Sequence, residues 1–286
     1  MFATLLKYEF KHSWKVLLPI NGANLLLGCI GFVLMLIMTA LFQSQNENIM
    51  AFGMLFYLLW AGLLLLLPIF AFASAIILSL RFYRHKFTDQ GYLTFTLPAT
   101  THQILLSSIA NFLIWNLLNA IITVICYVLM VLPFIVWMVK EIGQLGVEWS
   151  MLSEVLKILW ENYLGDIISI SAISIAGYIS YLIGSLFYGV MLPYVSIAVG
   201  STLAKRYKLL ASVGVGIGIY IVMYVITMLL QTLEYIIHLI TLFSMESLSI
   251  LSSGSITMLI MGILNFAFAI GGYFLTHHLI DKKLNL

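Results

Sequence analysis

Six long apolar runs, separated by shorter polar segments, dominate the pattern of this sequence. None of the six contains Asp, Glu, Lys or Arg, and each reaches the roughly 20 residues that a helix needs to cross the hydrocarbon core of a membrane. The runs at 104–139 and 167–204 exceed one simple span, so these helices are expected to tilt, to extend past the membrane or to break near Pro133 and Pro193. The pattern predicts six transmembrane helices over residues of about 16–42, 51–80, 104–139, 167–204, 209–230 and 255–280.

The composition agrees with this pattern. The 286 residues are 63% hydrophobic and only 8% charged, whereas a soluble domain carries about 25% charged residues. The sequence therefore predicts an all-α integral membrane protein with a single transmembrane domain over residues 1–286. Cys29 and Cys126 both lie inside apolar runs, which favours small buried side chains over a disulfide framework.

The basic residues are distributed unevenly between the segments that connect the spans. When these segments are assigned alternately to the two sides, one side holds eleven Lys and Arg with three acids, and the other holds two bases with eight acids. The positive-inside rule places the first set in the cytoplasm, which predicts a multi-pass protein of the cell membrane with both termini and residues 81–103 inside. The two bases on the outer side are Lys140 and Lys157.

Residues 1–15 have an amphipathic pattern. Their large apolar side chains share one arc of a helix and their lysines lie on the opposite arc, which predicts an N-terminal helix lying in the cytoplasmic interface. The alternative is a helical lead-in to the first span. The apolar arc comprises Phe2, Leu6, Phe10 and Trp14.

Two segments on the outer side are also expected to be helical. Residues 147–163 carry Trp at both ends of an apolar face, which predicts a helix on the outer membrane surface. Residues 231–254 are mostly apolar but too short to cross the membrane twice, so a re-entrant pair of helices is expected there.

The sequence contains no known signature of catalysis or nucleotide binding, and no catalytic residue is predicted. His277, His278 and Asp281 could suggest a metal site, but interfacial side chains beside Lys282 and Lys283 are the favoured interpretation, so no metal site is predicted. No charged residue lies near the middle of a span, which disfavours an ion-coupled carrier because such carriers use intramembrane charges.

Hydroxyl groups recur on one face of the fourth span at steps of three and four residues. Two interpretations stay open: hydrogen bonding between helices, or the lining of a path for a polar or amphipathic substrate. The same two interpretations apply to Asn21 and Asn24 in the first span, and to Asn111, Asn116 and Asn119 in the third. Within the stripe, the candidate path residues are Ser174, Tyr178, Tyr181 and Ser185.

The segment "RFYRHKFTDQGYLTFTLPATTHQILLSS" between the second and third spans combines charge, turn residues and apolar side chains. Thr88 is expected to cap a short helix that begins at Asp89 and ends before Pro98, and Thr100 or Thr101 to cap the third span. This helix would project Tyr92, Leu93 and Phe95 into the cytosol. The alternative is an ordinary loop whose Arg and Lys contact lipid headgroups.

This segment, the opening "LLKYEFKHSWKVLLP", the six spans and the segment between the last two spans resemble a permease subunit of the ABC type-2 exporters. The resemblance covers essentially the whole chain, and "GYLTFTLP" is its most specific part. The chain departs from the family in its long outer segment 140–166. The resemblance implies an N-terminal interfacial helix and a cytoplasmic coupling helix between spans two and three, seated in a groove of a separate ATPase.

The resemblance also implies partners and a source of energy. A cytosolic ABC ATPase subunit would carry ATP and Mg²⁺, this chain would bind no cofactor itself, and a second permease, identical or a sister chain, would share the bilayer. No enzymatic activity and no nucleic-acid partner are expected. The residues implied in coupling are Arg84, Lys86, Asp89, Gly91, Tyr92, Leu93 and Phe95.

Two other classes of function compete with an exporter subunit. A membrane sensor or scaffold could use the same segment to bind a cytosolic partner without transport. An intramembrane enzyme is disfavoured because no paired carboxylates and no nucleophile–base pair stand out. The substrate, whether a peptide antibiotic, a lipid or a drug, is not specified by the sequence.

Overall fold

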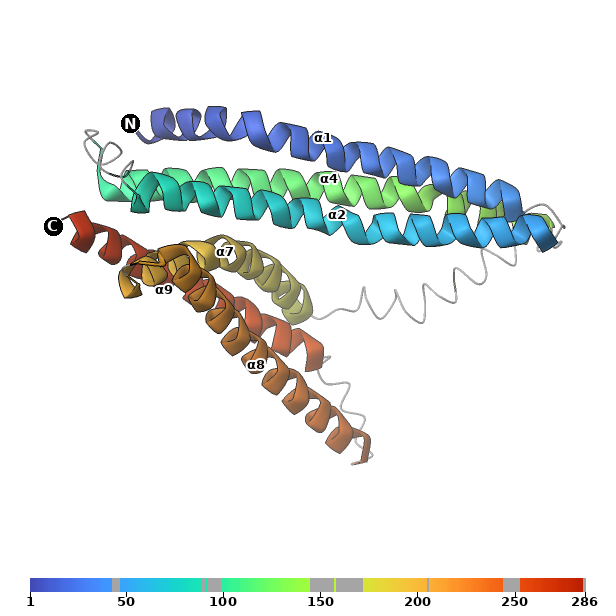
Figure 1. The fold of residues 1–286 in the computed structure, drawn as a ribbon. Helices are drawn as coiled ribbons and strands as arrows, with labels where there is room; N and C mark the ends of the chain where they lie inside the picture. The colour runs from blue at the N-terminus through green and yellow to red at the C-terminus, as the bar shows by residue number, and fades with distance from the viewer. Residues whose placement is uncertain are drawn as a thin grey trace. The chain divides into compact units, whose positions relative to one another are not determined.

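The computed structural model contains six long helices and no β-strand among the residues that it describes (Figure 1). The helices are α1 (Phe2–Phe42), α2 (Glu47–Phe87), α4 (Thr101–Gln144), α7 (Ala172–Leu203), α8 (Lys208–Phe243) and α9 (Ser253–Leu284). All six are long and apolar enough to cross a membrane, which confirms the all-helical, multi-span prediction. The described residues are 1–42, 47–88, 91, 99–144, 157, 172–204, 206–243 and 253–284.

The N-terminal amphipathic segment is not a separate helix. Residues 2–15 are the first turns of α1, which continues through Pro19 to Phe42. On its apolar arc, the rings of Phe10 and Trp14 lie 5.2 Å and 6.1 Å from the ring of Trp115 on α4. These contacts agree with the alternative expectation that residues 1–15 are a helical lead-in to the first span. The location of these residues in the membrane interface stays a prediction.

Of the three possibilities left open for the two longest runs, a break near Pro133 or Pro193 does not occur, because α4 and α7 run through these residues. Proline is tolerated in membrane helices, where neighbouring groups can satisfy the freed carbonyl.

The re-entrant pair expected over 231–254 is wrong for residues 231–243, which extend α8. They contain neither Gly nor Pro to stop the helix. Residues 244–252, and residues 147–163 apart from Lys157, lie outside the described part of the chain.

The chain divides into two compact units, each assembled from distant parts of the sequence. Unit 2 comprises Lys7–Leu78 and Ile114–Gly165, and unit 1 comprises Met1–Leu6, Ser79–Leu113 and Asp166–Leu286. Unit 2 thus takes most of α1, α2 and α4. Unit 1 takes α7, α8 and α9 together with the end of α2 and the start of α4.

Unit 2 has an apolar core and polar links between its three helices. Asn24 Nδ2 on α1 donates to Thr123 Oγ1 on α4 at 3.2 Å, and Asn119 Nδ2 on α4 donates to Ser74 Oγ on α2 at 2.6 Å. Interhelical hydrogen bonding is therefore the correct interpretation for Asn24 and Asn119. Its apolar core comprises Met35, Met38, Trp60, Leu67, Cys126 and Met130.

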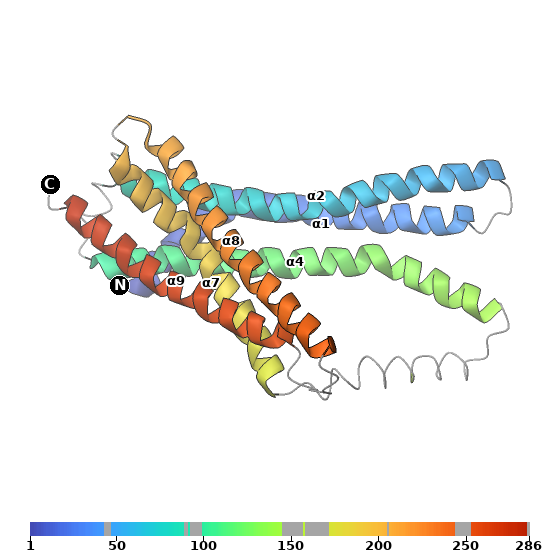
Figure 2. The same cartoon turned by 90° about the horizontal axis from the view of Figure 1, so that it is seen from below.

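In unit 1, α7 packs along both α8 and α9 (Figure 2). The approach of α7 to α9 depends on glycine, since a Cβ on Gly262 would lie 2.5 Å from the carbonyl carbon of Ser180. A Cβ on Gly184 would likewise lie 2.5 Å from the carbonyl oxygen of Gly262. Small residues serve this purpose in membranes, where close backbone packing replaces the hydrophobic effect between helices.

Gly262→Val is therefore expected to destabilise the protein by about 1–3 kcal/mol, because the new side chain must push α7 away from α9. The matched control is Gly271→Val on the same helix, where a Cβ would meet no atom within 4 Å. Unfolding in mixed detergent micelles with increasing SDS measures the difference between the two variants. Equal stability of the two variants would contradict the close approach at Gly262.

Candidate functional site

The predicted coupling segment begins at the end of α2, whose last turn is basic. Arg84 is exposed, whereas Lys86 is only 7% exposed. A basic last turn is favourable there because the carbonyl end of a helix carries partial negative charge. Asp89, Tyr92, Leu93 and Phe95, predicted to contact the ATPase, lie outside the described residues.

Gly91 has a local structural role that the sequence did not reveal. Its N–H donates to the carbonyl of Thr88 at 2.8 Å, and a Cβ at Gly91 would lie 2.8 Å from the carbonyl oxygen of Lys86. The Thr88 hydroxyl donates in turn to the carbonyl of Arg84, at the end of α2. The chain therefore folds back closely on α2 at Gly91, where a larger residue does not fit without movement.

An aromatic cluster, Phe82, Phe87, Phe112 and Tyr194, fixes the end of α2. The ring of Phe82 lies edge-on to Tyr194 of α7 with centroids 4.0 Å apart, and edge-on to Phe87 at 5.8 Å. Phe112 of α4 lies 5.7 Å from Tyr194 on another side. Tyr194 is 2% exposed, and its hydroxyl donates to the Ser108 carbonyl at 3.0 Å. Buried edge-to-face aromatic contacts of this kind join α2, α7 and α4.

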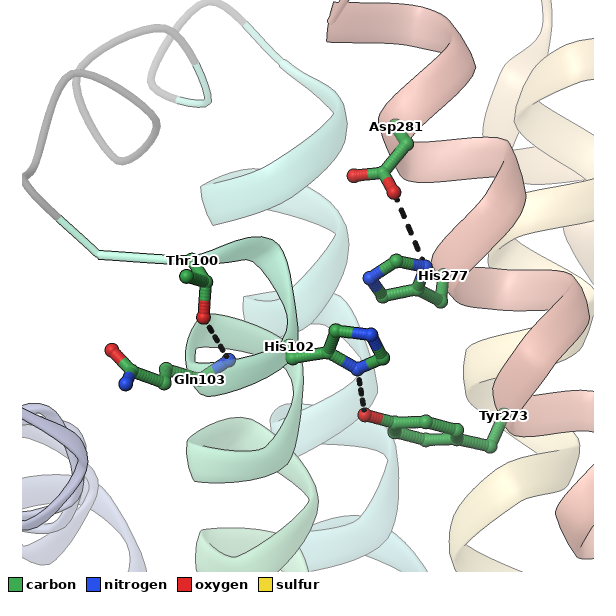
Figure 3. A network of polar contacts seen from close by, with 6 residues as sticks. All are labelled: Thr100, His102, Gln103, Tyr273, His277 and Asp281. Atoms are coloured by element: carbon green, nitrogen blue, oxygen red, sulfur yellow. Dashed lines mark hydrogen bonds and ion pairs between the residues drawn. The ribbon is translucent and has the colours of Figure 1, made fainter.

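A histidine cluster, His102, Tyr273, His277 and Asp281, fixes the start of α4 to α9 (Figure 3). His102 Nδ1 lies 2.7 Å from Tyr273 Oη, and the ring of His102 stacks on that of His277 with centroids 3.8 Å apart. His277 Nδ1 lies 3.2 Å from Asp281 Oδ2, one helical turn further along α9. The polar groups of both helix ends therefore meet one another.

The start of α4 also carries the predicted cap. Thr100 Oγ1 accepts a hydrogen bond from the backbone N–H of Gln103 at 3.4 Å, and α4 begins at Thr101 (Figure 3). This is the geometry of a helix N-cap, and it confirms Thr100 as the capping residue. The segment between α2 and α4 thus enters α4 through a defined turn.

The two clusters lie on either side of the same segment. The aromatic cluster attaches the end of α2, which precedes the segment, to α7. The histidine cluster attaches the start of α4, which follows the segment, to α9. A displacement of the segment would therefore reach two helices of unit 1. Among the residues that the structure describes, no group of three His, Cys, Asp or Glu is arranged to hold a metal ion.

The predicted substrate-path residues lie on α7. Tyr178 and Tyr181 are 50% and 39% exposed. Ser185 Oγ donates to the Leu182 carbonyl of its own helix at 3.0 Å, and nothing is described of the side chain of Ser174. Their role in a substrate path stays a prediction.

Sequence reasoning missed the residues that anchor the segment. Phe82 and Phe87 flank its basic residues, and aromatic residues near the ends of spans would have been a usable signal. Tyr194 lies inside an apolar run and carries no such signal. His277 and Asp281 were considered with His278 only as a disfavoured metal site, and the contact of His277 with His102 depends on tertiary structure.

No family model, no curated protein and no solved structure matches this chain. The resemblance to exporter permeases therefore rests on the sequence features that carry it. The case for a function rests on those features together with the geometry around the segment between α2 and α4.

Proposed function

We propose that this chain is the transmembrane permease subunit of an ATP-driven ABC exporter, energised by a separate cytosolic ATPase that binds the segment between α2 and α4. The observation that carries the proposal is the attachment of both flanks of this segment to α7 and α9. A loop that only contacts lipid headgroups needs no such attachment. A loop that transmits the movement of a partner does need it.

The mechanism requires the energy to come from outside the membrane, since the spans contain no charged residue near their middle. Closure of the ATPase on ATP would push the segment. The two clusters would pass this displacement to α7 and α9, and the bundle would change between inward- and outward-facing packings. A second permease, identical or a sister chain, would complete the path for a peptide, lipid or drug.

The contact with the ATPase is assigned to an apolar knob with a charged rim. In this proposal Tyr92, Leu93 and Phe95 would form the knob, and Arg84 with Asp89 would form the rim. Lys86 is predicted in the rim as well, although it is only 7% exposed. Gly91 is assigned to the turn that supports the knob.

Orientation in the membrane is tested by labelling single cysteines with an impermeant maleimide in intact cells. The background replaces Cys29 and Cys126, with Cys126→Ser keeping the donor that reaches the Asn24 carbonyl at 3.5 Å. Because positive charge marks the cytoplasmic side, a cysteine at Glu148 should label from outside, and one at Gln90 only after the membrane is opened. Equal labelling of both from outside contradicts cytoplasmic termini.

The proposed function is tested by isolating the chain from its own cells with an affinity tag. An ATPase with nucleotide-binding motifs is expected to co-purify, and its hydrolysis in proteoliposomes is expected to depend on this chain. A bound partner without nucleotide-binding motifs would instead favour the sensor or scaffold. A chain that retains no partner in a mild detergent would count against both.

A further inference from the structure

Unit 2 has an apolar groove between the second half of α1 and the second half of α4, with a volume of about 350 Å³. It lies within one unit and takes no part in the clusters around the coupling segment. Its walls are hydrophobic except for one charged residue, Lys140, and one hydroxyl, Thr39. The lining residues are Phe32, Leu36, Thr39, Ala40, Leu132, Pro133, Val136, Trp137 and Lys140.

The length of the groove suits one leaflet of a bilayer. On each helix its lining spans eight steps along the chain, from Phe32 to Ala40 and from Leu132 to Lys140. At 1.5 Å per residue this is about 12 Å. One leaflet contributes about half of the roughly 30 Å hydrocarbon core. The groove is therefore long enough to hold most of the part of one acyl chain that lies within a single leaflet.

The charge lies at one end of the groove. Lys140 is the last lining residue of α4, it is exposed, and α4 ends four residues later at Gln144. The next residue, Glu141, is turned by about 100° around the helix and does not line the groove. The hydroxyl of Thr39 donates to the Leu36 carbonyl at 2.9 Å, so it adds no free donor to the wall.

This lysine is unusual for its place in the chain. It is one of only two bases in the segments predicted outside, which together hold eight acids. The side chain of Trp137 lies one turn before Lys140 and packs near Phe42 with ring centroids 6.5 Å apart. Tryptophan at the end of a span favours the headgroup level of a membrane. Lys140 would therefore meet headgroups and the rest of the groove would meet acyl chains.

We propose that this groove is a binding site for a membrane lipid with an anionic headgroup, with an acyl chain along α1 and α4 and the phosphate at Lys140. The charge complementarity of one ammonium at the mouth of an apolar groove selects this occupant over a zwitterionic lipid. The site does not depend on the proposed ATPase partner, so each can fail without the other.

The test is native mass spectrometry of the purified full-length chain in detergent, titrated with phosphatidylglycerol and phosphatidylcholine of the same acyl chains. The wild type is expected to bind one phosphatidylglycerol about fivefold more tightly than phosphatidylcholine, the contribution of one Lys near an anionic headgroup. Lys140→Gln should abolish this preference and Lys140→Arg should keep it. Ala40→Trp, which fills the groove, should weaken the binding of both lipids.

The matched control is Lys157→Gln, which removes the other base of the predicted outer side, an exposed residue that does not line the groove. It should retain the wild-type preference. Helix content by circular dichroism must match the wild type in every variant. The proposal is overturned if the wild type shows no preference, if Lys140→Gln behaves as wild type, if both glutamine variants lose the preference equally, or if Ala40→Trp changes nothing.

Discussion

Replacing Leu93 and Phe95 together by Asp is expected to lower the affinity of the chain for its ATPase by about thirtyfold or more. Removing a buried apolar anchor from an interface often costs about 2 kcal/mol or more, and the introduced carboxylates would have to enter the ATPase groove without a partner. Co-purification from a mild detergent measures the affinity, and ATP hydrolysis in proteoliposomes measures the coupling. Insertion should be unaffected because both residues lie between the spans.

A comparable pair of substitutions tests the other predicted cytoplasmic connection. Tyr207→Asp with Leu210→Asp makes a comparable chemical change at the α7–α8 connection and the first turn of α8, where both residues are exposed. This variant should keep the ATPase bound. If it detaches the ATPase while the pair at Leu93 and Phe95 does not, the contact lies at the α7–α8 connection and the assignment of the coupling segment is wrong.

Tyr194→Ala is expected to destabilise the protein by about 3–5 kcal/mol, the usual cost of removing a large aromatic side chain from a packed interior. The ring contacts Phe82 and Phe112, and its hydroxyl reaches the Ser108 carbonyl. Tyr194→Phe keeps both ring contacts and loses only the hydrogen bond, for which about 0.6 kcal/mol is typical in membrane proteins. SDS unfolding in mixed micelles separates the two variants.

The matched control for stability is Tyr178→Ala, which removes the same side chain from an exposed position of the same helix. It should unfold close to the wild type. If the proposed function is correct, the Tyr194→Ala permease should still bind the ATPase but should no longer stimulate its ATP hydrolysis. The reason is that α2 and α7 would no longer move together. Full stimulation in this variant would contradict transmission through the aromatic cluster.

Much of the fold could be predicted from the sequence because few backbone conformations are stable in the hydrocarbon core of a membrane. The backbone N–H and C=O groups in the hydrocarbon core must be satisfied inside the protein, and a helix satisfies nearly all of its own, so a long apolar run predicts a helix by itself. All six helices follow from this rule, even though Pro19, Pro68, Pro133 and Pro193 lie inside them. A cap at Thr100 or Thr101 was predictable for a different reason, since capping depends only on neighbouring residues, and the structure has it at Thr100.

Helix ends were less predictable than helix existence. The end of α8 at Phe243 rather than near residue 230 shows why. The composition changes at Gln231, but no residue there stops the hydrogen bonding of the helix, and Thr232 Oγ1 bonds to the Met228 carbonyl one turn earlier. Hydropathy marks where a chain leaves the lipid, whereas the helix continues for as long as its backbone bonds are favourable.

Which helices pack together, and through which faces, was decided by the tertiary structure alone. His102 and Tyr273 meet from positions 171 residues apart, and Tyr194 reaches the Ser108 carbonyl across 86. In a soluble protein an apolar stripe would show which face of a helix is buried. In a membrane helix the lipid-facing and protein-facing sides are both apolar, so the hydrophobic pattern does not show which side packs against other helices. On α7 the exposed Tyr178 and Tyr181 and the buried Tyr194 all lie within one apolar run, and only the tertiary structure shows which of these tyrosines packs against other helices.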